Sequence, residues 1–300
     1  MGGSDFYFYS LFVDIKFTFI KYETISITVH ISKEMMKKTI SNLPLQVKGV
    51  NFSYGKKNVL RNITFSVPHA SICGLLGPNG SGKTTLLGCI SGIKKLESGS
   101  IFLHGKAVQM MTRKEIAREV SVVPQQTGFI FPFKVLDMVL MGKAPVKEIW
   151  ETPSLADREE ALGVLERLGI RELSGRTFQQ ISGGEKQMVL IARSLLQNTD
   201  IMLLDEPTSH LDMKNQILIL DLIKKVSYEN RITVLMTLHD PNLALHYCDQ
   251  IILLKNGQIM SQGNTSEVMQ SQKLSNVYGI EVELGITSKG TRVVVPSCWR

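Results

Sequence analysis

The stretch Gly77-Pro78-Asn79-Gly80-Ser81-Gly82-Lys83-Thr84 decides the fold of this 300-residue chain. Its spacing is typical of a loop that holds phosphate, because glycines let the backbone turn tightly and point successive N–H groups at phosphate oxygens. Residues 71–76 predict a strand before the loop, and Lys83 to Ile90 predict a helix after it. The helix N-terminus adds partial positive charge. In this setting the pattern indicates phosphate binding.

Two side chains of the loop supply chemistry that backbone amides lack. Lys83 is expected to reach the β- and γ-phosphates of a nucleotide, and the Thr84 hydroxyl is expected to be a ligand of Mg²⁺.

A strand that ends in two carboxylates is the candidate for the second half of the site. The apolar run 201–204 is followed by Asp205 and Glu206. Asp205 at the strand tip can hold the Mg²⁺ shell, and Glu206 can polarise an attacking water as a general base. Acidic turns after strands are common, so this interpretation depends on the phosphate loop.

The segment Ser182-Gly183-Gly184-Glu185 has two compatible interpretations. Ser182 with Glu185 three residues later is a capping box that begins an amphipathic helix over 184–196. The same helix N-terminus could be directed at a γ-phosphate, with the Ser182 hydroxyl and glycine N–H groups as donors.

Three further candidates follow predicted strands. His239 comes after the run 232–238, which is expected to bring its imidazole near the nucleotide, and Gln125 comes after the run 120–123. Tyr54 ends the run 45–54 and could stack on an adenine. Each of these residues, taken alone, has an ordinary structural interpretation.

The wider pattern predicts an α/β protein. The runs 45–54 and 59–67 are typical of a hairpin, joined by a turn at 55–58. The near-continuous apolar runs at 201–204, 232–238 and 251–254 predict parallel strands buried on both faces. Helices are expected at 113–118, 134–141, 155–168 and near 213–228, with a strand at 120–123.

Composition excludes several classes of protein. With 43% hydrophobic and 20% charged residues, the chain is neither disordered nor collagen-like. Four cysteines do not make a disulfide scaffold, and Cys73 and Cys89 are expected in the core. No apolar run is long enough for a membrane-spanning helix. The net charge of +7 comes without a long Lys/Arg block, so no nucleic-acid partner is expected; an anionic membrane surface and a bound nucleotide account for it.

The first 34 residues differ from the rest. They carry three lysines and four acids, so residues 35–300 have a net charge of +8, and eight of the 21 aromatic residues lie within the first 22 positions. We therefore predict an extension at 1–34 and one main domain with a C-terminal tail at 35–300. Alternating apolar residues at 25–31 predict a strand of an added hairpin or membrane-surface element. The alternatives are a disordered segment, or a true start at Met35 or Met36, which we favour.

Together the motifs resemble an ATP-binding cassette (ABC) ATPase from about Leu45 to Ile259. They stand in the order of the family's A-loop, Walker A, Q-loop, signature, Walker B, D-loop and H-loop: Tyr54, Gly77 to Thr85, Gln125, Ile181 to Gln187, Ile201 to Glu206, Ser209 to Asp212, and His239. The resemblance implies a P-loop NTPase fold of the ABC type, with a RecA-like core, an antiparallel β subdomain and a helical subdomain.

The resemblance also implies roles for these residues. ATP would contact Tyr54 and the stretch Gly77, Pro78, Asn79, Gly80, Ser81, Gly82, Lys83, Thr84 and Thr85. Glu206 would be the general base, His239 would contact the γ-phosphate, and Thr84, Gln125 and Asp205 would surround Mg²⁺. Cassettes of the family dimerise head to tail, so Ser182, Gly183, Gly184 and Glu185 would act on the partner's ATP. Asp212 would couple the two sites.

Four segments look like the cassettes of iron-siderophore, haem and cobalamin importers: Phe131 to Gly142, Thr208 to Gln216, His239 to Ala244, and Val277 to Val282. This implies an ATP-hydrolysing subunit, peripheral on the cytoplasmic face of the membrane. Its partners would be a second copy, integral membrane permease subunits and, indirectly, an extracytoplasmic substrate-binding protein. Importers of molybdate or tungstate share these traits and remain an alternative.

Proteins of another class also remain. A soluble P-loop kinase would not need the signature segment. Repair proteins of the ABC family carry a long coiled-coil insertion, and translation proteins carry two cassettes in one chain. A degenerate regulatory ATP-binder is expected to lose Lys83 or Glu206, and both are present.

Overall fold

The computed structural model describes residues 15–17, 27–29, 43–125, 131–148 and 150–298, and the chain divides into the units Met1–Leu43 and Pro44–Arg300. In the first unit, β1 (Ile15–Phe17) pairs antiparallel with β2 (Ile27–Val29), which lies in the segment predicted as a strand. The boundary predicted after residue 34 lies outside the described residues.

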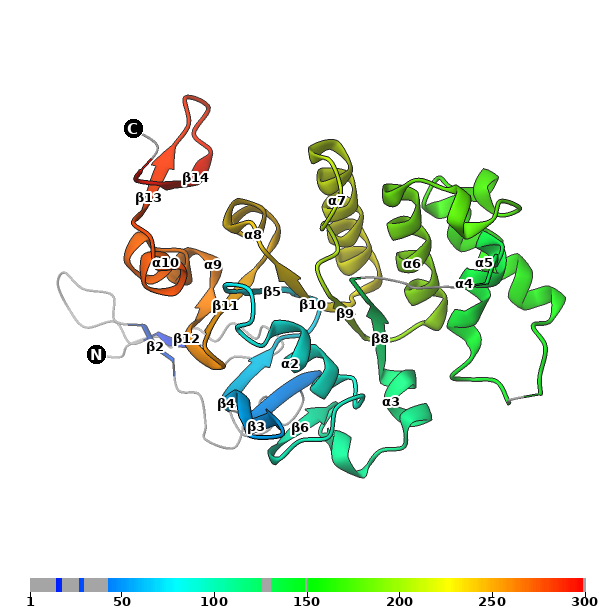
Figure 1. Cartoon of the computed structure of the whole chain (residues 1–300), viewed down its shortest axis with the longest axis horizontal. Coiled ribbons are helices and arrows are strands. Elements are labelled where there is room, and N and C mark those ends of the chain that lie inside the picture. The colour runs from blue at the N-terminus through cyan, green and yellow to red at the C-terminus, as the bar shows by residue number, and fades with distance from the viewer. Residues whose placement is uncertain (1–14, 18–26, 30–42, 126–130, 149, 299–300) are drawn as a thin grey trace, which may run out of the picture. The chain divides into compact units, whose positions relative to one another are not determined.

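A six-stranded sheet forms the centre of the second unit (Figure 1). Its order is β12 (Gln258–Asn264), β11 (Gln250–Lys255), β5 (Ile72–Leu76), β10 (Thr233–Leu238), β9 (Ile201–Leu204) and β8 (Val120–Val123). Neighbouring strands are parallel except for β12, which pairs antiparallel with β11 at the edge. The apolar runs predicted as parallel strands are confirmed.

The sheet is apolar on both faces because its side chains alternate between two cores. Ile72 and Leu76 of β5 belong to the core that includes residues of α6 (Gly183–Gln197), α7 (Met213–Asn230) and α8 (Pro241–Tyr247). Cys73 and Leu75 belong to the core that includes α2 (Lys83–Ile90) and a second sheet. Cys89 of α2 is in this second core, as predicted.

The second sheet is antiparallel, in the order β4 (Lys57–Val67), β3 (Leu45–Tyr54), β6 (Ser98–Leu103) and β7 (Lys106–Ala107). The predicted hairpin supplies β3 and β4. Sequence patterning missed β6 and β7, whose alternation is short and interrupted by Gly99. After this sheet come η1 (Val108–Met110) and α3 (Arg113–Glu119), which leads directly into β8.

A helical region separates β8 from β9 along the chain, and its helices group on one side of the second unit (Figure 1). It contains α4 (Val135–Leu140), η2 (Met141–Lys143), α5 (Leu155–Arg167), η3 (Arg171–Leu173), η4 (Phe178–Gln180) and α6. Met138, Leu165 and Ile191 are fully buried where these helices pack. The helices predicted at 134–141, 155–168 and 184–196 are present, with bounds that shift only slightly.

The C-terminal tail adds α9 (Thr265–Val268), α10 (Ser271–Tyr278) and the hairpin of β13 (Val282–Ile286) and β14 (Arg292–Pro296). None of the helices in the described part of the chain has the length and hydropathy of a membrane-spanning segment. The architecture matches the predicted fold class: an α/β core, an antiparallel β subdomain and a helical subdomain.

Two glycines of the helical region provide a matched test of its packing. A Cβ on Gly142 would lie 2.4 Å from the carbonyl oxygen of Arg193, whereas a Cβ on Gly163 in α5 would meet nothing within 4 Å. We expect Gly142→Ala to lower the free energy of unfolding by about 1–3 kcal/mol. Gly163→Ala should raise it by about 0.5–1 kcal/mol. Urea unfolding measures both, and unchanged stability of Gly142→Ala would contradict the close approach of η2 to α6.

Candidate functional site

The candidate residues meet because their strands are neighbours. The strands β5, β10, β9 and β8 lie side by side and parallel, and at their carboxyl ends stand Gly77, His239, Asp205 with Glu206, and Gln125. Ligands of open α/β sheets bind at this edge. The order of strands in the sheet therefore brings residues that are far apart in the sequence into one site. The sequence alone could not provide this order.

The phosphate loop needs glycine where it leaves β5. Gly77 has φ +155°, and a Cβ there would lie 2.0 Å from the carbonyl oxygen of Leu254 on β11. Gly82, the N-cap of α2, is left-handed with φ 110°. Only glycine adopts such backbone without strain, and the tight path places α2 directly behind the loop.

Lys83 is a buried cation held inside this loop. Its ammonium Nζ donates to the carbonyl oxygens of Gly77 at 2.9 Å and Pro78 at 3.2 Å. Burial lowers the pKa of Lys83, and the nearby carboxylates of Glu206 and Asp205 oppose that shift. Among the residues that the structure describes, this ammonium donates only to these two neutral carbonyl oxygens. A buried cation with neutral partners has a strong electrostatic preference for an anion such as phosphate.

Asp205 connects three elements. Its Oδ1 accepts a hydrogen bond from the Thr84 hydroxyl of α2 at 3.2 Å and another from the Thr237 hydroxyl of β10 at 2.9 Å. Asp205 is only 7% exposed. A carboxylate and a hydroxyl that touch each other at a phosphate loop form the oxygen-rich pair that Mg²⁺ prefers, so the residues present fit this ion.

Glu206 has a left-handed backbone conformation, with φ 51°, which residues other than glycine rarely adopt. Its backbone N–H donates to the Thr237 hydroxyl at 2.7 Å, which anchors the residue in this conformation. A left-handed non-glycine residue held in place by its surroundings is typical of functional sites. Here the conformation turns the carboxylate away from the strand and toward Gln125 and His239.

Gln125 and His239 hold the two oxygens of the Glu206 carboxylate. The Gln125 amide donates to Oε2, and the His239 Nε2 lies 2.5 Å from Oε1. The Glu206 side chain is 12% exposed and that of His239 is 43% exposed. The three residues predicted from separate strands therefore form one cluster.

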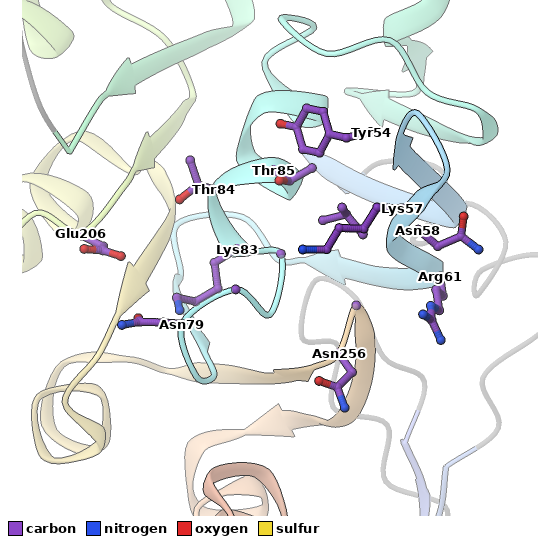
Figure 2. Close-up of a pocket in the computed structure, with 14 residues that line it drawn as sticks. Tyr54, Lys57, Asn58, Arg61, Asn79, Lys83, Thr84, Thr85, Glu206 and Asn256 are labelled. Atoms are coloured by element: carbon purple, nitrogen blue, oxygen red, sulfur yellow. The ribbon is translucent and has the colours of Figure 1, made fainter.

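A cavity of about 640 Å³ lies over the phosphate loop (Figure 2). This volume is suited to a small molecule such as a nucleotide. Of the predicted residues, its lining includes Tyr54, Asn79, Gly80, Gly82, Lys83, Thr84, Thr85 and Glu206. Ser81 is buried beneath the loop, and Asp205 lies behind Thr84.

Tyr54 forms one wall of this cavity. Its ring packs edge-on against Phe52, with centroids 4.9 Å apart, and Lys94 Nζ lies 4.9 Å from its centroid. A hydrogen bond with Lys94 lowers the Tyr54 pKa. The ring is 51% exposed, so an aromatic surface remains for stacking.

Sequence reasoning missed a basic rim around the same cavity. Lys57, Asn58 and Arg61 on β4, together with Asn256 between β11 and β12, line it (Figure 2). The available signal was the Lys56-Lys57 pair in the turn after Tyr54. Nothing in the sequence brings Asn256 to the same place.

Ser182 begins α6 as a capping box. The Ser182 hydroxyl accepts from the Glu185 N–H at 3.3 Å, and the Glu185 carboxylate accepts from the Ser182 N–H at 2.7 Å. Hydrogen bonding to the Ser182 side chain and, second, to the Ser182 backbone N–H lowers the pKa of the Glu185 carboxyl group. A Cβ on Gly184 would lie 3.0 Å from the Asn215 amide of α7, while one on Gly183 would lie 3.4 Å from Leu211.

Asp212 caps α7 and binds Asn215, the residue whose amide lies beside Gly184. Its carboxylate accepts from the Asn215 N–H at 2.8 Å and from the Asn215 side-chain amide at 3.0 Å. Ser182, Gly183, Gly184, Glu185 and Asp212 are not among the residues that line the cavity. The capping interpretation is confirmed, and a role toward a partner's nucleotide stays a prediction.

The geometry and sequence together define an ABC transporter ATP-binding protein. The family model described as ABC transporter matches residues 60–209. The chain therefore belongs to the ABC transporter family and binds ATP as its members do.

Relatives and solved structures agree with this assignment. The chain is 42% identical over 240 residues to a Helicobacter pylori protein named "Probable iron chelatin transport ATP-binding protein", covering 80% of this chain and 94% of the relative. It is 34% identical to the Bacillus subtilis iron(3+)-hydroxamate import ATP-binding protein FhuC, over 80% of this chain and 89% of the relative. A solved structure described as "An inward-facing conformation of a putative metal-chelate type ABC transporter" superposes with a TM-score of 0.76 at 29% identity, covering 85% of this chain and 98% of that one.

Thr237 is a site residue that sequence reasoning did not find. It is fully buried within the apolar run of β10, yet its hydroxyl links the Asp205 carboxylate to the Glu206 N–H. We expect Thr237→Val to lower the free energy of unfolding by about 1–3 kcal/mol, because it leaves two buried polar groups with one partner fewer. Thr237→Ser keeps the hydroxyl and should lower the free energy of unfolding clearly less than Thr237→Val does. Urea denaturation of both variants tests this, and equal losses would contradict it.

Proposed function

We propose that this chain hydrolyses ATP to ADP and phosphate as the motor subunit of an ABC importer. The cluster of Gln125, Glu206 and His239 beside Lys83 is the observation that carries the proposal. It supports the proposal because a carboxylate held by two partners lies near Lys83, the residue expected to bind the γ-phosphate. ATP binding alone would not require this arrangement.

The reaction follows from these positions. A water oxygen attacks the γ-phosphorus in line with the bond to the β,γ-bridging oxygen, and that bond breaks to leave ADP. Glu206 accepts the proton that the water loses, and Gln125 and His239 keep its carboxylate oriented. Lys83 and the loop N–H groups stabilise the negative charge on the phosphates. We also propose that His239, whose side chain is 43% exposed, contacts a γ-phosphate oxygen.

Thr84 and Asp205 are the residues that would hold Mg²⁺, with Gln125 completing the set. When bound, the ion neutralises charge on the phosphate oxygens. Asp205 is suited to this role because the Thr84 and Thr237 hydroxyls already fix its Oδ1. In addition, Tyr54 is proposed to stack on the adenine.

A second copy of the chain completes the proposed site. Ser182 and the glycines after it begin α6 at a helix N-terminus with partial positive charge, yet they lie outside the cavity of their own chain. In a head-to-tail dimer, each chain would present Ser182, Gly183, Gly184 and Glu185 to the ATP on the partner's loop. Asp212 would connect the two sites.

The importer role requires partners that cross the membrane. We propose that the subunit lies on the cytoplasmic face, bound to integral membrane permease subunits through the region from Gln125 to Gly142. The structure describes two parts of this region: Gln125, which donates to the Glu206 carboxylate, and residues 131–142, which contain α4 and the start of η2. ATP binding would close the dimer and hydrolysis would reopen it. An extracytoplasmic protein would deliver the cargo.

We propose an iron(III)-siderophore or related metal chelate as the cargo. The support comes from relatives named for iron chelatin, hydroxamate and enterobactin transport. A non-transport role of the repair type is less well supported, because the longest helix among the described residues between α2 and α6 is α5, with 13 residues. That is too short for a coiled-coil arm.

The catalytic assignment has a direct test. We expect Glu206→Gln to bind ATP but to hydrolyse it at least about tenfold more slowly, because the amide cannot accept the water proton. Glu229→Gln, at an exposed glutamate of α7, is the control and should keep the wild-type rate. A phosphate-release assay measures kcat, and an unchanged rate in Glu206→Gln would defeat the assignment.

Nucleotide affinity tests the phosphate loop separately. We expect Lys83→Ala to weaken ATP binding at least about tenfold, since it removes the buried cation that faces the phosphates. Lys289→Ala, at an exposed lysine between β13 and β14, should bind like the wild type. Fluorescence titration with a labelled ATP measures both affinities. Equal affinity of Lys83→Ala and the wild type would contradict the loop assignment.

Cargo is tested in cells. Deletion of the gene should lower uptake of ⁵⁵Fe-labelled siderophore, and a plasmid copy of the wild type should restore it. The Lys83→Ala copy should not. Undiminished uptake of every ferric siderophore tested, with a loss of molybdate uptake instead, would move the assignment to the alternative cargo.

A further inference from the structure

We propose that the C-terminal hairpin β13–β14 positions His239 through Asn242. This inference rests on the role proposed above for His239. Asn242 is a positioning residue: it acts through the loop that carries His239 and has no place in the nucleotide cavity described above.

The side-chain amide of Asn242 pairs with the backbone of β14 through two hydrogen bonds, as the backbone of a neighbouring strand does. Its Oδ1 accepts from the backbone N–H of Val294 at 2.7 Å, and its Nδ2 donates to the carbonyl oxygen of Val294 at 3.2 Å. One amide thus satisfies both backbone groups of a single residue on β14. Two hydrogen bonds in one plane fix orientation as well as distance.

The hairpin is a firm support because it is held elsewhere. The backbone N–H of Val282 donates to the Ser275 hydroxyl at 2.9 Å, and that of Leu284 donates to the Ser271 hydroxyl at 3.1 Å. Both serines belong to α10, whose Leu274 is fully buried in the main core. The tail therefore does not depend on Asn242 alone for its place.

A short, stiff segment connects Asn242 to His239. Asp240 is the N-cap of α8, and its carboxylate accepts from the Asn242 N–H at 2.8 Å. Pro241 occupies the first helical position, where its ring fixes φ. The three residues after His239 therefore have little freedom to move independently, so an orientation imposed at Asn242 is passed to the imidazole.

The consequence for hydrolysis is geometric. His239 Nε2 lies 2.5 Å from Glu206 Oε1, and a displacement of 1 Å would break this contact. Misplacement on that scale can cost up to about a hundredfold in rate. Loss of the Asn242 clamp should therefore lower kcat while leaving the loop that binds the phosphates intact.

The test compares Asn242→Ala and the isosteric Asn242→Asp in the full-length chain. Asn242→Asp puts an acceptor where the amide donated to the Val294 carbonyl oxygen. We expect both to lower kcat for ATP about tenfold with KM changed less than about threefold. Amide hydrogen exchange should become faster at 239–247 and 292–296. Ile286→Ser, at a hairpin residue that is 73% exposed, is the matched control and should behave like the wild type.

A double-mutant cycle separates positioning from a general loss of structure. If Asn242 acts through His239, Asn242→Ala should lower kcat less than twofold further in a His239→Ala background. Equal losses in both backgrounds would overturn the proposal. So would faster exchange at 239–247 with wild-type kcat, or unchanged exchange in Asn242→Ala. If His239→Ala itself keeps wild-type kcat, the proposed role of His239 fails, and the positioning role fails with it.

Discussion

The buried carboxylate of Asp205 is the constraint on which the rest of the site depends. Its Oδ1 receives the Thr84 hydroxyl from the start of α2 and the Thr237 hydroxyl from β10. These two hydrogen bonds connect the phosphate loop, β9 and β10 at one atom. Because Thr237 also accepts the Glu206 N–H, the same network fixes the backbone that aims the neighbouring carboxylate.

Burial on both faces of the sheet makes that network rigid. Residues of β5, β9 and β10 alternate between a core with α6, α7 and α8 and a core with α2 and the antiparallel sheet. The strand ends therefore cannot shift without disturbing two packed layers. Leu76, Leu204 and Leu238 are each almost fully buried just before the residue that begins a functional segment.

Sequence patterns predicted those parts of the site whose residues are contiguous in the chain. The phosphate loop, the strand before Asp205 and the capping box at Ser182 each lie within a short segment, so their patterns could be recognised directly. Thr237 was missed because one threonine in an apolar run looks like an ordinary core residue. Asn242 and Val294 are 52 residues apart, and only the folded tail brings them together. The rim of Lys57, Arg61 and Asn256 likewise brings β4 together with the turn between β11 and β12, which sequence patterns cannot place.

A structure of Glu206→Gln with ATP and Mg²⁺ would test the central claim most directly. The account predicts the γ-phosphate between Lys83 and the residue at 206, and Mg²⁺ in contact with Thr84 and Asp205. It also predicts Ser182 of the partner subunit on the same phosphate. A nucleotide bound away from the loop, or Mg²⁺ without a contact to either Thr84 or Asp205, would contradict it.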